Sequence, residues 1–200
     1  MDVGLSTVEQ AADALRAGRP AIFPTDTVLG LGVSVRHAQT PAVLYDLKHR
    51  DGGKPVAWLV GSPDDILVYG KDVPAYAAAA ARAFWPGALT LIVKASDQVP
   101  LAFRSEAGTI GLRMPDSACA LELLGLVGCP IATTSANMSG APSAGAIVDL
   151  DEDLARRVGV VLVGKAEPSG VASTVVDCTG ASPAVVRQGA VTLSALESLA

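Results

Sequence analysis

Three basic side chains, Lys48, Arg50 and Lys54, follow one another within a short stretch of the chain. They could be a solvated charge run after a helix end, where cations are favourable in any case. They could instead form a phosphate clamp, because a triphosphate carries about four negative charges near neutral pH and requires several converging cations. If this segment is extended, His49 faces outward and Lys48 and Arg50 share the other side.

Short polar side chains gather in two further places, each after an apolar stretch. Residues 133–140 read Thr-Thr-Ser-Ala-Asn-Met-Ser-Gly, so five of the eight carry a hydroxyl or an amide, and Ser135 and Asn137 are candidate ligand contacts rather than only a helix cap. Residues 24–32 contain Thr27 and two glycines. They could be a turn with local hydrogen bonds, or a floor of hydroxyl groups where glycines let a ligand approach the backbone.

Two arginines stand at the ends of expected strands. Arg113 closes the stretch 109–113, either as a surface residue or as a buried partner for a carboxylate or phosphate. Its apolar neighbours favour the buried partner. Arg187 lies near the C-terminus, and with Ser173 it could be a ligand contact or a simple strand residue.

Several familiar chemistries are excluded by residue type and spacing. His37 and His49 are the only histidines, so an HExxH zinc site cannot form, and no GxSxG nucleophile motif is present. The run Gly52-Gly53-Lys54 lacks the earlier glycine of a phosphate-binding Walker loop and is followed by Pro55. A nucleotide would therefore have to be held by another arrangement. The cysteines (Cys119, Cys129 and Cys178) form no CxxC pair and are expected to be free thiols.

The elements expected around these residues describe one α/β domain over residues 1–200, with a core of about 7–190 and a mixed sheet. The first helix is expected to start with a capping box from Ser6 to Glu9.

The net charge of −5 disfavours a general nucleic-acid binder, although a local basic groove could exist. No signal peptide or membrane span is expected, and the cytosol is the expected compartment. Strands are expected at 21–23, 56–60, 89–93, 109–113, 131–134, 160–163, 173–177 and 185–187. Helices are expected at 41–47, 75–84, 115–126, 151–157 and 192–199, and residues 62–65 are expected to start a further helix.

Taken in order, these clusters resemble the YrdC/TsaC family of threonylcarbamoyl-AMP synthases. The resemblance spans almost the whole chain. Any one matching string is weak evidence, but the ordered set of strings is specific for the family. The matching strings are residues 24–32, Lys48-x-Arg50, residues 85–90, 111–115, 134–140, 173–177 and 187–190.

The resemblance implies a YrdC-like fold, with a twisted sheet and a concave ligand cleft. It also implies an enzyme that joins L-threonine, bicarbonate and ATP, with magnesium as the counterion of the triphosphate and no metal-binding residues. The threonylcarbamoyl group would pass to tRNA through partner proteins. Lys48 and Arg50 would be the catalytic pair. ATP would contact Lys48, Arg50, Lys54, Thr109, Asn137 and Arg187, and threonine would contact Thr27, Arg113, Ser135 and Ser173.

Four positions depart from the family pattern: Asp51, Leu59, Gly145 and Gln188. The end of the chain soon after Arg187 suggests that the extra C-terminal domain of longer relatives is absent. Two alternatives stay open at this point. One is a module that binds double-stranded RNA or tRNA, which the acidic charge and few aromatics disfavour. The other is a paralogue that acts on a different carbamoyl compound.

Overall fold

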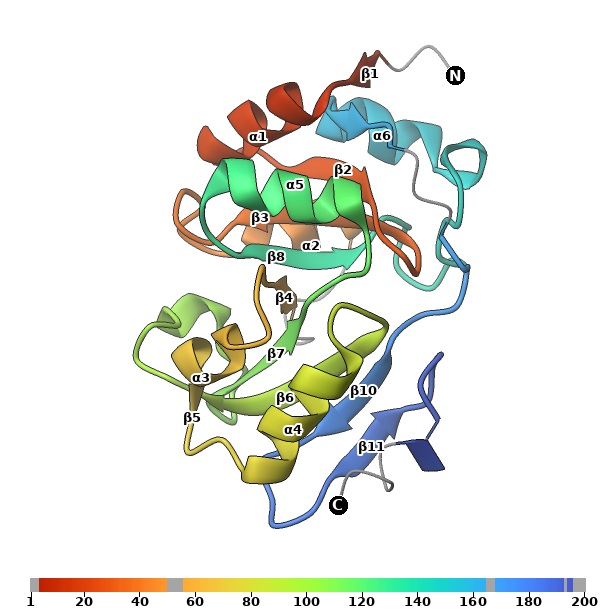
Figure 1. Ribbon diagram of the computed structural model, residues 1–200. Helices are drawn as coiled ribbons and strands as arrows, with labels where there is room; N and C mark the ends of the chain where they lie inside the picture. Colours follow the sequence, from red (N-terminus) through yellow and green to blue (C-terminus); the bar gives the residue numbers. More distant parts are fainter. Residues whose placement is uncertain (1–3, 50–55, 165–167, 193, 196–200) are drawn as a thin grey trace.

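The computed structural model describes residues 4–49, 56–164, 168–192 and 194–195. One 11-stranded mixed sheet crosses the molecule in the order β1-β9-β2-β3-β8-β4-β7-β6-β10-β11, with β5 paired to β6 (Figure 1). The mixed sheet with its helices confirms the expected α/β class. The strands are β1 (Leu5–Ser6), β2 (Ala21–Pro24), β3 (Leu29–Ser34), β4 (Ala57–Leu59), β5 (Gly70–Lys71), β6 (Leu89–Ala95), β7 (Thr109–Arg113), β8 (Ile131–Ser135), β9 (Val161–Leu162), β10 (Thr174–Asp177) and β11 (Ala184–Arg187).

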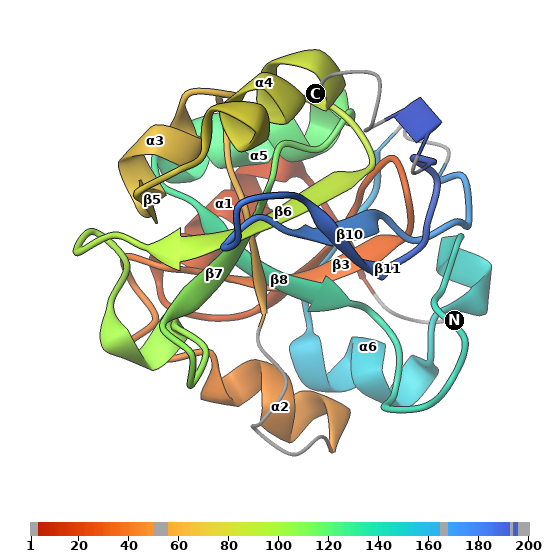
Figure 2. The same ribbon diagram turned by 90° about the horizontal axis from the view of Figure 1, so that it is seen from below.

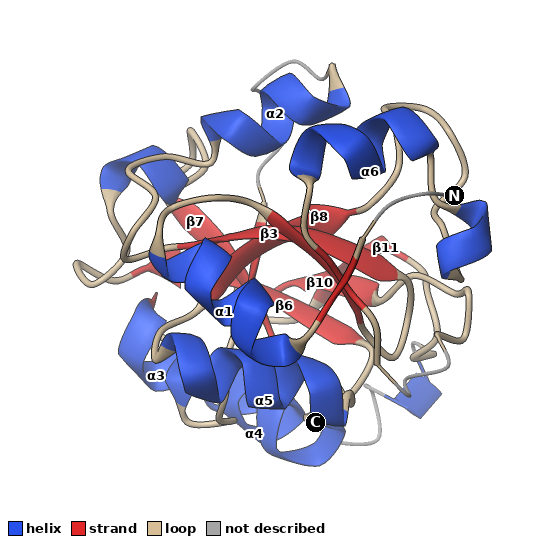
Figure 3. Cartoon of the chain, turned by 90° about the horizontal axis from the view of Figure 1, so that it is seen from above, coloured by secondary structure: helices blue, strands red, loops and turns tan. Residues whose placement is uncertain are grey.

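Helices cover both faces of the sheet (Figures 2 and 3). Four of them, α1 (Val8–Arg16), α3 (Asp65–Tyr69), α4 (Ala75–Phe84) and α5 (Ala118–Val127), lie on one side. On the other side lie α2 (Ala42–Lys48) and α6 (Glu152–Val158). Two short 3-10 turns complete the assignment, at Leu101–Phe103 and Ile147–Asp149. None of the helices in the described ranges is long and apolar enough to cross a membrane.

Alternation along the strands separates a packed face of the sheet from a face that carries polar groups. On β4, Trp58 is fully buried against the edges of Tyr69 and Phe103, at centroid distances of 5.4 and 5.6 Å. Its neighbours Ala57 and Leu59 point to the opposite face, where they line a cavity. The packed face therefore anchors the strands, and the other face can carry a ligand site.

Three local expectations need correction. The capping box of α1 is formed by Thr7 and Gln10, one residue later than expected, because the Thr7 hydroxyl accepts from the Gln10 amide and the Gln10 side chain accepts from the Thr7 amide. Helix α5 starts at Ala118, since Ser117 supplies its cap. The segment 24–32 is not all turn, because β3 begins at Leu29.

The end of α2 is also different from the extended segment considered above. His49 adopts a left-handed conformation (φ 47°) that closes the helix, and its Nε2 lies 3.1 Å from Arg157 Nη1 of α6. Lys48 is the last residue of the helix and points inward. The helix expected at 192–199 falls mainly outside the described residues.

Candidate functional site

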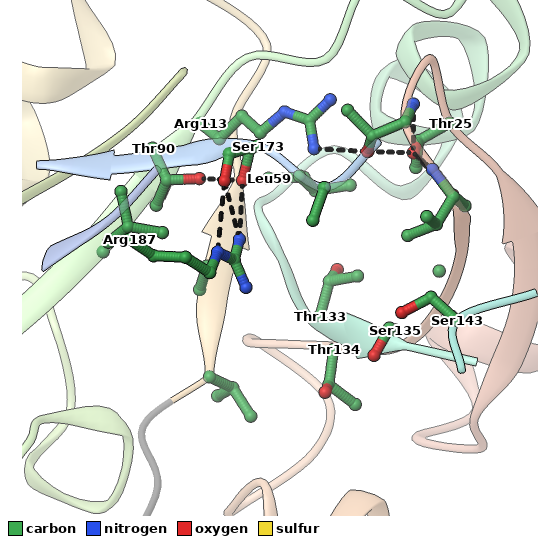
Figure 4. Close-up of a pocket in the computed structure, with 18 of the residues that line it drawn as sticks. Thr25, Leu59, Thr90, Arg113, Thr133, Thr134, Ser135, Ser143, Ser173 and Arg187 are labelled. Carbon is green, nitrogen blue, oxygen red and sulfur yellow. Dashed lines mark hydrogen bonds between the residues drawn. The ribbon is translucent and has the colours of Figure 1, made fainter. Parts of the chain in front are cut away.

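A cavity of about 500 Å³ lies on the polar face of the sheet (Figure 4). On β4, β6 and β7 every second residue lines it, as the pleat requires, whereas three consecutive residues at the end of β8 reach it. Thus Thr90 and Ile92 of β6 reach the cavity, while Leu91 and Val93 are buried on the other face. The cavity also receives residues that follow or end strands, including Ser135 on β8 and Arg187 on β11.

Small residues in register make room for this cavity. Ala57 of β4 pairs with Gly111 of β7 and with Thr133 of β8, so these three residues form a row across the sheet. Gly30 of β3 pairs with Ser135 beside that row. Because Gly30, Ala57 and Gly111 project little or no side chain, the polar groups around them can face an open space rather than each other.

Lys48 brings the first cation into the cavity, at the end of α2. The residue is only 3% exposed, and its ammonium is surrounded by oxygens of the β8 end. Nζ donates to the Ser135 carbonyl at 2.5 Å and to the Ser135 hydroxyl at 3.3 Å. It also donates to Asn137 Oδ1 at 3.2 Å, and the Asn137 amide in turn donates to the carbonyls of Met138 and Ala141. The cation and the loop after β8 are therefore a single hydrogen-bonded unit.

Arg113 brings the second cation, at the end of β7. Its guanidinium is 8% exposed and pairs with Asp26 through a 2.5 Å contact from Nη2 to Oδ1. Nη1 donates to the Thr27 hydroxyl at 2.8 Å, and Nε donates to the Gly87 carbonyl at 2.9 Å. Burial lowers the pKa of Arg113, and the Asp26 carboxylate opposes that effect. Arginine nevertheless stays charged in proteins.

Arg187 brings the third cation, from the edge strand β11. Its Nη2 donates to the Ser173 carbonyl at 2.8 Å and to the Ser173 hydroxyl at 3.2 Å. The Ser173 hydroxyl also lies 2.9 Å from the Thr90 hydroxyl of β6, as Figure 4 shows. Burial lowers the pKa of Arg187. Residues of β6 and β11 thereby hold this serine, which directly precedes β10, in place beside the cavity.

The balance of charge in the cavity is positive, although the whole chain carries −5. Lys48, Arg113 and Arg187 line it, and the described lining residues include no Asp or Glu. Within the described ranges, no group of three or more His, Cys, Asp or Glu could hold a metal ion. Cations and hydroxyl donors converging on a space of this size suit an anionic small molecule.

Eight of the ten site residues expected from the sequence line this one cavity, and the other two, Arg50 and Lys54, lie outside the described residues. Among the eight, Thr109 has its hydroxyl 2.7 Å from Ser105 Oγ. The eight are Thr27, Lys48, Thr109, Arg113, Ser135, Asn137, Ser173 and Arg187.

Other lining residues had no ligand role assigned from the sequence, although the matched strings contain several of them. Thr90 is one of them, since a hydroxyl within a buried strand gives no signal of its own until β10 and β11 are placed beside it. Asp26, which pairs with Arg113, was visible only as part of the first motif. The remaining unassigned polar lining residues are Thr25, Thr133, Thr134, Ser139 and Ser143.

Comparison with known proteins places this chain in a known family. The model of the Sua5, YciO and YrdC proteins, described as "Telomere recombination", matches residues 13–189. The chain is 41% identical over 192 residues to a putative threonylcarbamoyl-AMP synthase of Mycobacterium leprae, covering 94% of this chain and 84% of that protein. It is 34% identical over 189 residues to the threonylcarbamoyl-AMP synthase of Pyrococcus abyssi, covering 94% of this chain and 56% of that protein.

Solved structures agree with the sequence match. P. abyssi Sua5 complexed with L-threonine superimposes with a TM-score of 0.90 at 34% identity, over 96% of this chain and 56% of that one. E. coli YciO, at 24% identity and a TM-score of 0.85, shares the fold over 94% of this chain and 92% of its own. This chain thus spans just over half the length of the P. abyssi protein. Since the family model covers most of the sequence, the chain belongs to the Sua5/YciO/YrdC family.

Proposed function

We propose that this chain is a threonylcarbamoyl-AMP synthase, a nucleotidyltransferase that uses L-threonine, bicarbonate and ATP. The observation that carries the proposal is the cavity itself, in which three cations and many hydroxyl groups converge with no carboxylate among the described lining residues. The named activity of the relatives and the L-threonine in the P. abyssi structure support this assignment.

The proposed reaction has two steps that balance. The threonine nitrogen attacks the carbon of bicarbonate, and loss of water leaves an N-carboxylate. One oxygen of that carboxylate then attacks the α-phosphorus of ATP, and the bond to the β-phosphate oxygen breaks. Pyrophosphate leaves, and threonylcarbamoyl-AMP remains.

The protein's part in such a transfer is mainly to position the reactants and to stabilise negative charge. Lys48 supplies a fixed positive charge beside Asn137, and we assign both residues to the ATP side together with Thr109 and Arg187. Arg50 and Lys54 would complete the phosphate contacts. ATP would enter as its magnesium complex, in which the triphosphate and water supply most metal ligands.

We assign the threonine side to the part of the cavity around Arg113, which can receive a carboxylate. Thr27, Ser135 and Ser173 supply hydroxyl groups for it, each already oriented by a neighbouring hydrogen bond. Because Lys48 and Arg187 donate two of these bonds, the two ligand sides adjoin one another. Downstream, the product would be handed to transferase proteins that modify tRNA, in the cytosol, where three free thiols are compatible with a reducing environment.

The test is release of pyrophosphate from magnesium ATP in carbon-dioxide-free buffer, with bicarbonate and L-threonine added separately and together. Release that requires both would support the proposal. Arg50→Ala should abolish it while the fold persists, whereas Arg82→Ala, on the exposed side of α4, should not. ATP binding without threonine-dependent release would point to a different carbamoyl substrate. Salt-sensitive RNA binding without any turnover would point to the RNA-binding alternative.

A further inference from the structure

The guanidinium of Arg113 is held from behind by a residue that does not itself line the cavity. Thr25 and Thr27 line it, whereas Asp26 between them does not. The Asp26 carboxylate is 16% exposed and lies 2.5 Å from Arg113 Nη2. Asp26 is thus placed to act on Arg113 rather than on a ligand.

The turn that carries Asp26 is itself fixed in several ways. The Thr25 hydroxyl donates to the Val28 carbonyl at 2.6 Å and accepts from the Thr27 amide at 3.2 Å. The Asp26 carbonyl accepts from the Ser169 amide at 2.9 Å. A carboxylate on so constrained a turn has little freedom to follow a moving guanidinium, so the turn sets where Arg113 points.

Hydrogen bonds to Thr27 and Gly87, together with the ion pair to Asp26, hold the Arg113 guanidinium from three sides. Its Nε donates to the Gly87 carbonyl, while the Gly87 amide donates to the Met114 carbonyl at 2.8 Å, so the two segments are bonded in both directions. The contacts to Asp26, Thr27 and Gly87 use three of the five N–H groups that a guanidinium carries. One N–H on each of Nη1 and Nη2 then has no partner among the described residues.

We propose that Asp26 is a positioning residue that fixes Arg113 for the carboxylate of the amino-acid substrate. This inference rests on the proposed function. The negative charge of Asp26 would offset the cost of burying the Arg113 guanidinium when no ligand is bound. Its hydrogen bond would also direct the two remaining N–H groups of Arg113 to the cavity. Without Asp26, the guanidinium could turn away from the position that the substrate requires.

A first experiment needs no substrate. The Arg113 Nε–H resonance, identified by its loss in Arg113→Lys, is followed by nitrogen-15 NMR for exchange with water. We expect a protected signal in the unmodified protein and in Asp26→Asn, whose amide oxygen can still accept the bond. In Asp26→Ala the exchange should be about tenfold faster or more, because the guanidinium loses its ion pair and the bond from Nε to the Gly87 carbonyl opens more often. Unchanged protection in Asp26→Ala would overturn the proposal.

A second experiment measures the threonine KM and the ATP KM by pyrophosphate release. Asp26→Ala should raise the threonine KM about tenfold or more while the ATP KM changes little, and Asp26→Asn should lie between. Asp97→Ala, which removes an exposed carboxylate that pairs with Arg104, is the matched control and should change neither. An unchanged or lower threonine KM in Asp26→Ala would refute the positioning role.

The two experiments separate the two proposals. If the unmodified protein shows no threonine-dependent release, the proposed function fails, and the NMR measurement alone decides whether Asp26 fixes Arg113. If Asp26→Ala does not fold, the threonine KM of Asp26→Asn carries the test. A threonine KM unchanged in Asp26→Asn would show that the charge of Asp26 is not needed to position Arg113, and would overturn the proposal.

Discussion

The ammonium of Lys48 lies 3.2 Å from the side-chain oxygen of Asn137, although 89 positions separate the two residues. The contact joins the end of α2 to the loop that follows β8, and it turns a charged side chain at a helix end into part of the cavity wall. An amide oxygen does not neutralise an ammonium, so the bond to Asn137 leaves the positive charge of Lys48 in place at the cavity wall.

Lys48→Met tests this charge directly. Methionine keeps an unbranched side chain but removes the ammonium, so stabilisation of developing negative charge on the phosphates is lost. We expect the rate of threonine-dependent pyrophosphate release to fall by about 100-fold. This factor corresponds to the free energy that a hydrogen bond to a charged group contributes. Lys71→Met, at an exposed position of β5, is the control and should retain full activity. Equal activity in the two variants would remove Lys48 from the phosphate contacts.

Thr90 and Ser173 should behave as one unit, because their hydroxyls lie 2.9 Å apart and Arg187 donates to Ser173. In a cycle of Thr90→Val, Ser173→Ala and the double variant, we expect a coupling of about 0.5–3 kcal/mol in threonine binding. The measurement is calorimetric titration with L-threonine.

The control cycle combines Thr90→Val with Thr109→Val. Thr109 pairs across the sheet with Lys94, four positions (94 minus 90) along β6 from Thr90, and its hydroxyl bonds to Ser105. These two changes should add within about 0.5 kcal/mol. Additive behaviour of Thr90→Val and Ser173→Ala would mean that their contact does not matter for the ligand.

Because of Cys178, the free energy of unfolding should fall as the solution becomes alkaline. Burial, with a smaller effect of Asp177, raises the pKa of this thiol from 9.0 to about 12. The unfolded chain therefore loses the thiol proton at a lower pH than the native protein does. The contribution is complete below the unfolded pKa near 9.0 and is lost as pH rises toward about 12, by at most about 1.4 kcal/mol per pH unit.

The measurement is the free energy of unfolding by urea across this pH range. Cys178→Ala should be less stable than the parent near neutral pH, and the difference should shrink as pH rises. Val176→Ala removes a buried group from β10, two residues before Cys178, without removing a titrating atom, so its deficit should stay constant. A constant deficit in both variants would show that the thiol does not couple to folding.

The sequence predicted most elements well where their signals are local. The alanine-rich helix α4 and strand β7 have the expected bounds, because their ends are marked by residues with strong local preferences, such as Pro74 before α4. The capping box of α1 was wrong by one residue, since Ser6 and Thr7 offer the same hydroxyl chemistry and only packing selects Thr7. Strand β3 was missed because Gly30 and Gly32 read as turn residues when considered alone.

The packing around Gly32 explains why a strand needs glycine there. A side-chain carbon on Gly32 would lie 2.6 Å from Ile131 and 3.0 Å from Phe23, so the close approach of β3 to β8 depends on the missing side chain. The same reasoning explains the site. Individual residues could be named from motifs, but contacts such as Asp26 with Arg113 depend on segments 87 positions apart, which no local pattern specifies.

A substitution at Gly189 tests how closely the segment after Arg187 packs against the backbone of Ser173 and Thr174. A side-chain carbon there would lie 2.5 Å from the Ser173 carbonyl carbon and 2.5 Å from the Thr174 nitrogen, both backbone atoms that cannot move aside alone. Gly189→Ala should therefore lift Arg187 from Ser173 and cost about 1–3 kcal/mol of unfolding free energy, the typical cost of overpacking.

Activity should fall more than stability alone explains, because Arg187 would lose its bonds to Ser173 even in folded molecules. Unfolding by urea and pyrophosphate release at a temperature where the variant is fully folded separate the two effects. Gly125→Ala is the matched control, since a side chain there meets nothing within 4 Å and lies within α5. It should gain about 0.5–1 kcal/mol and keep full activity. If Gly189→Ala matched that control, the Arg187 segment would not need to sit so close to Ser173, and the assignment of Arg187 to the cavity would lose its structural basis.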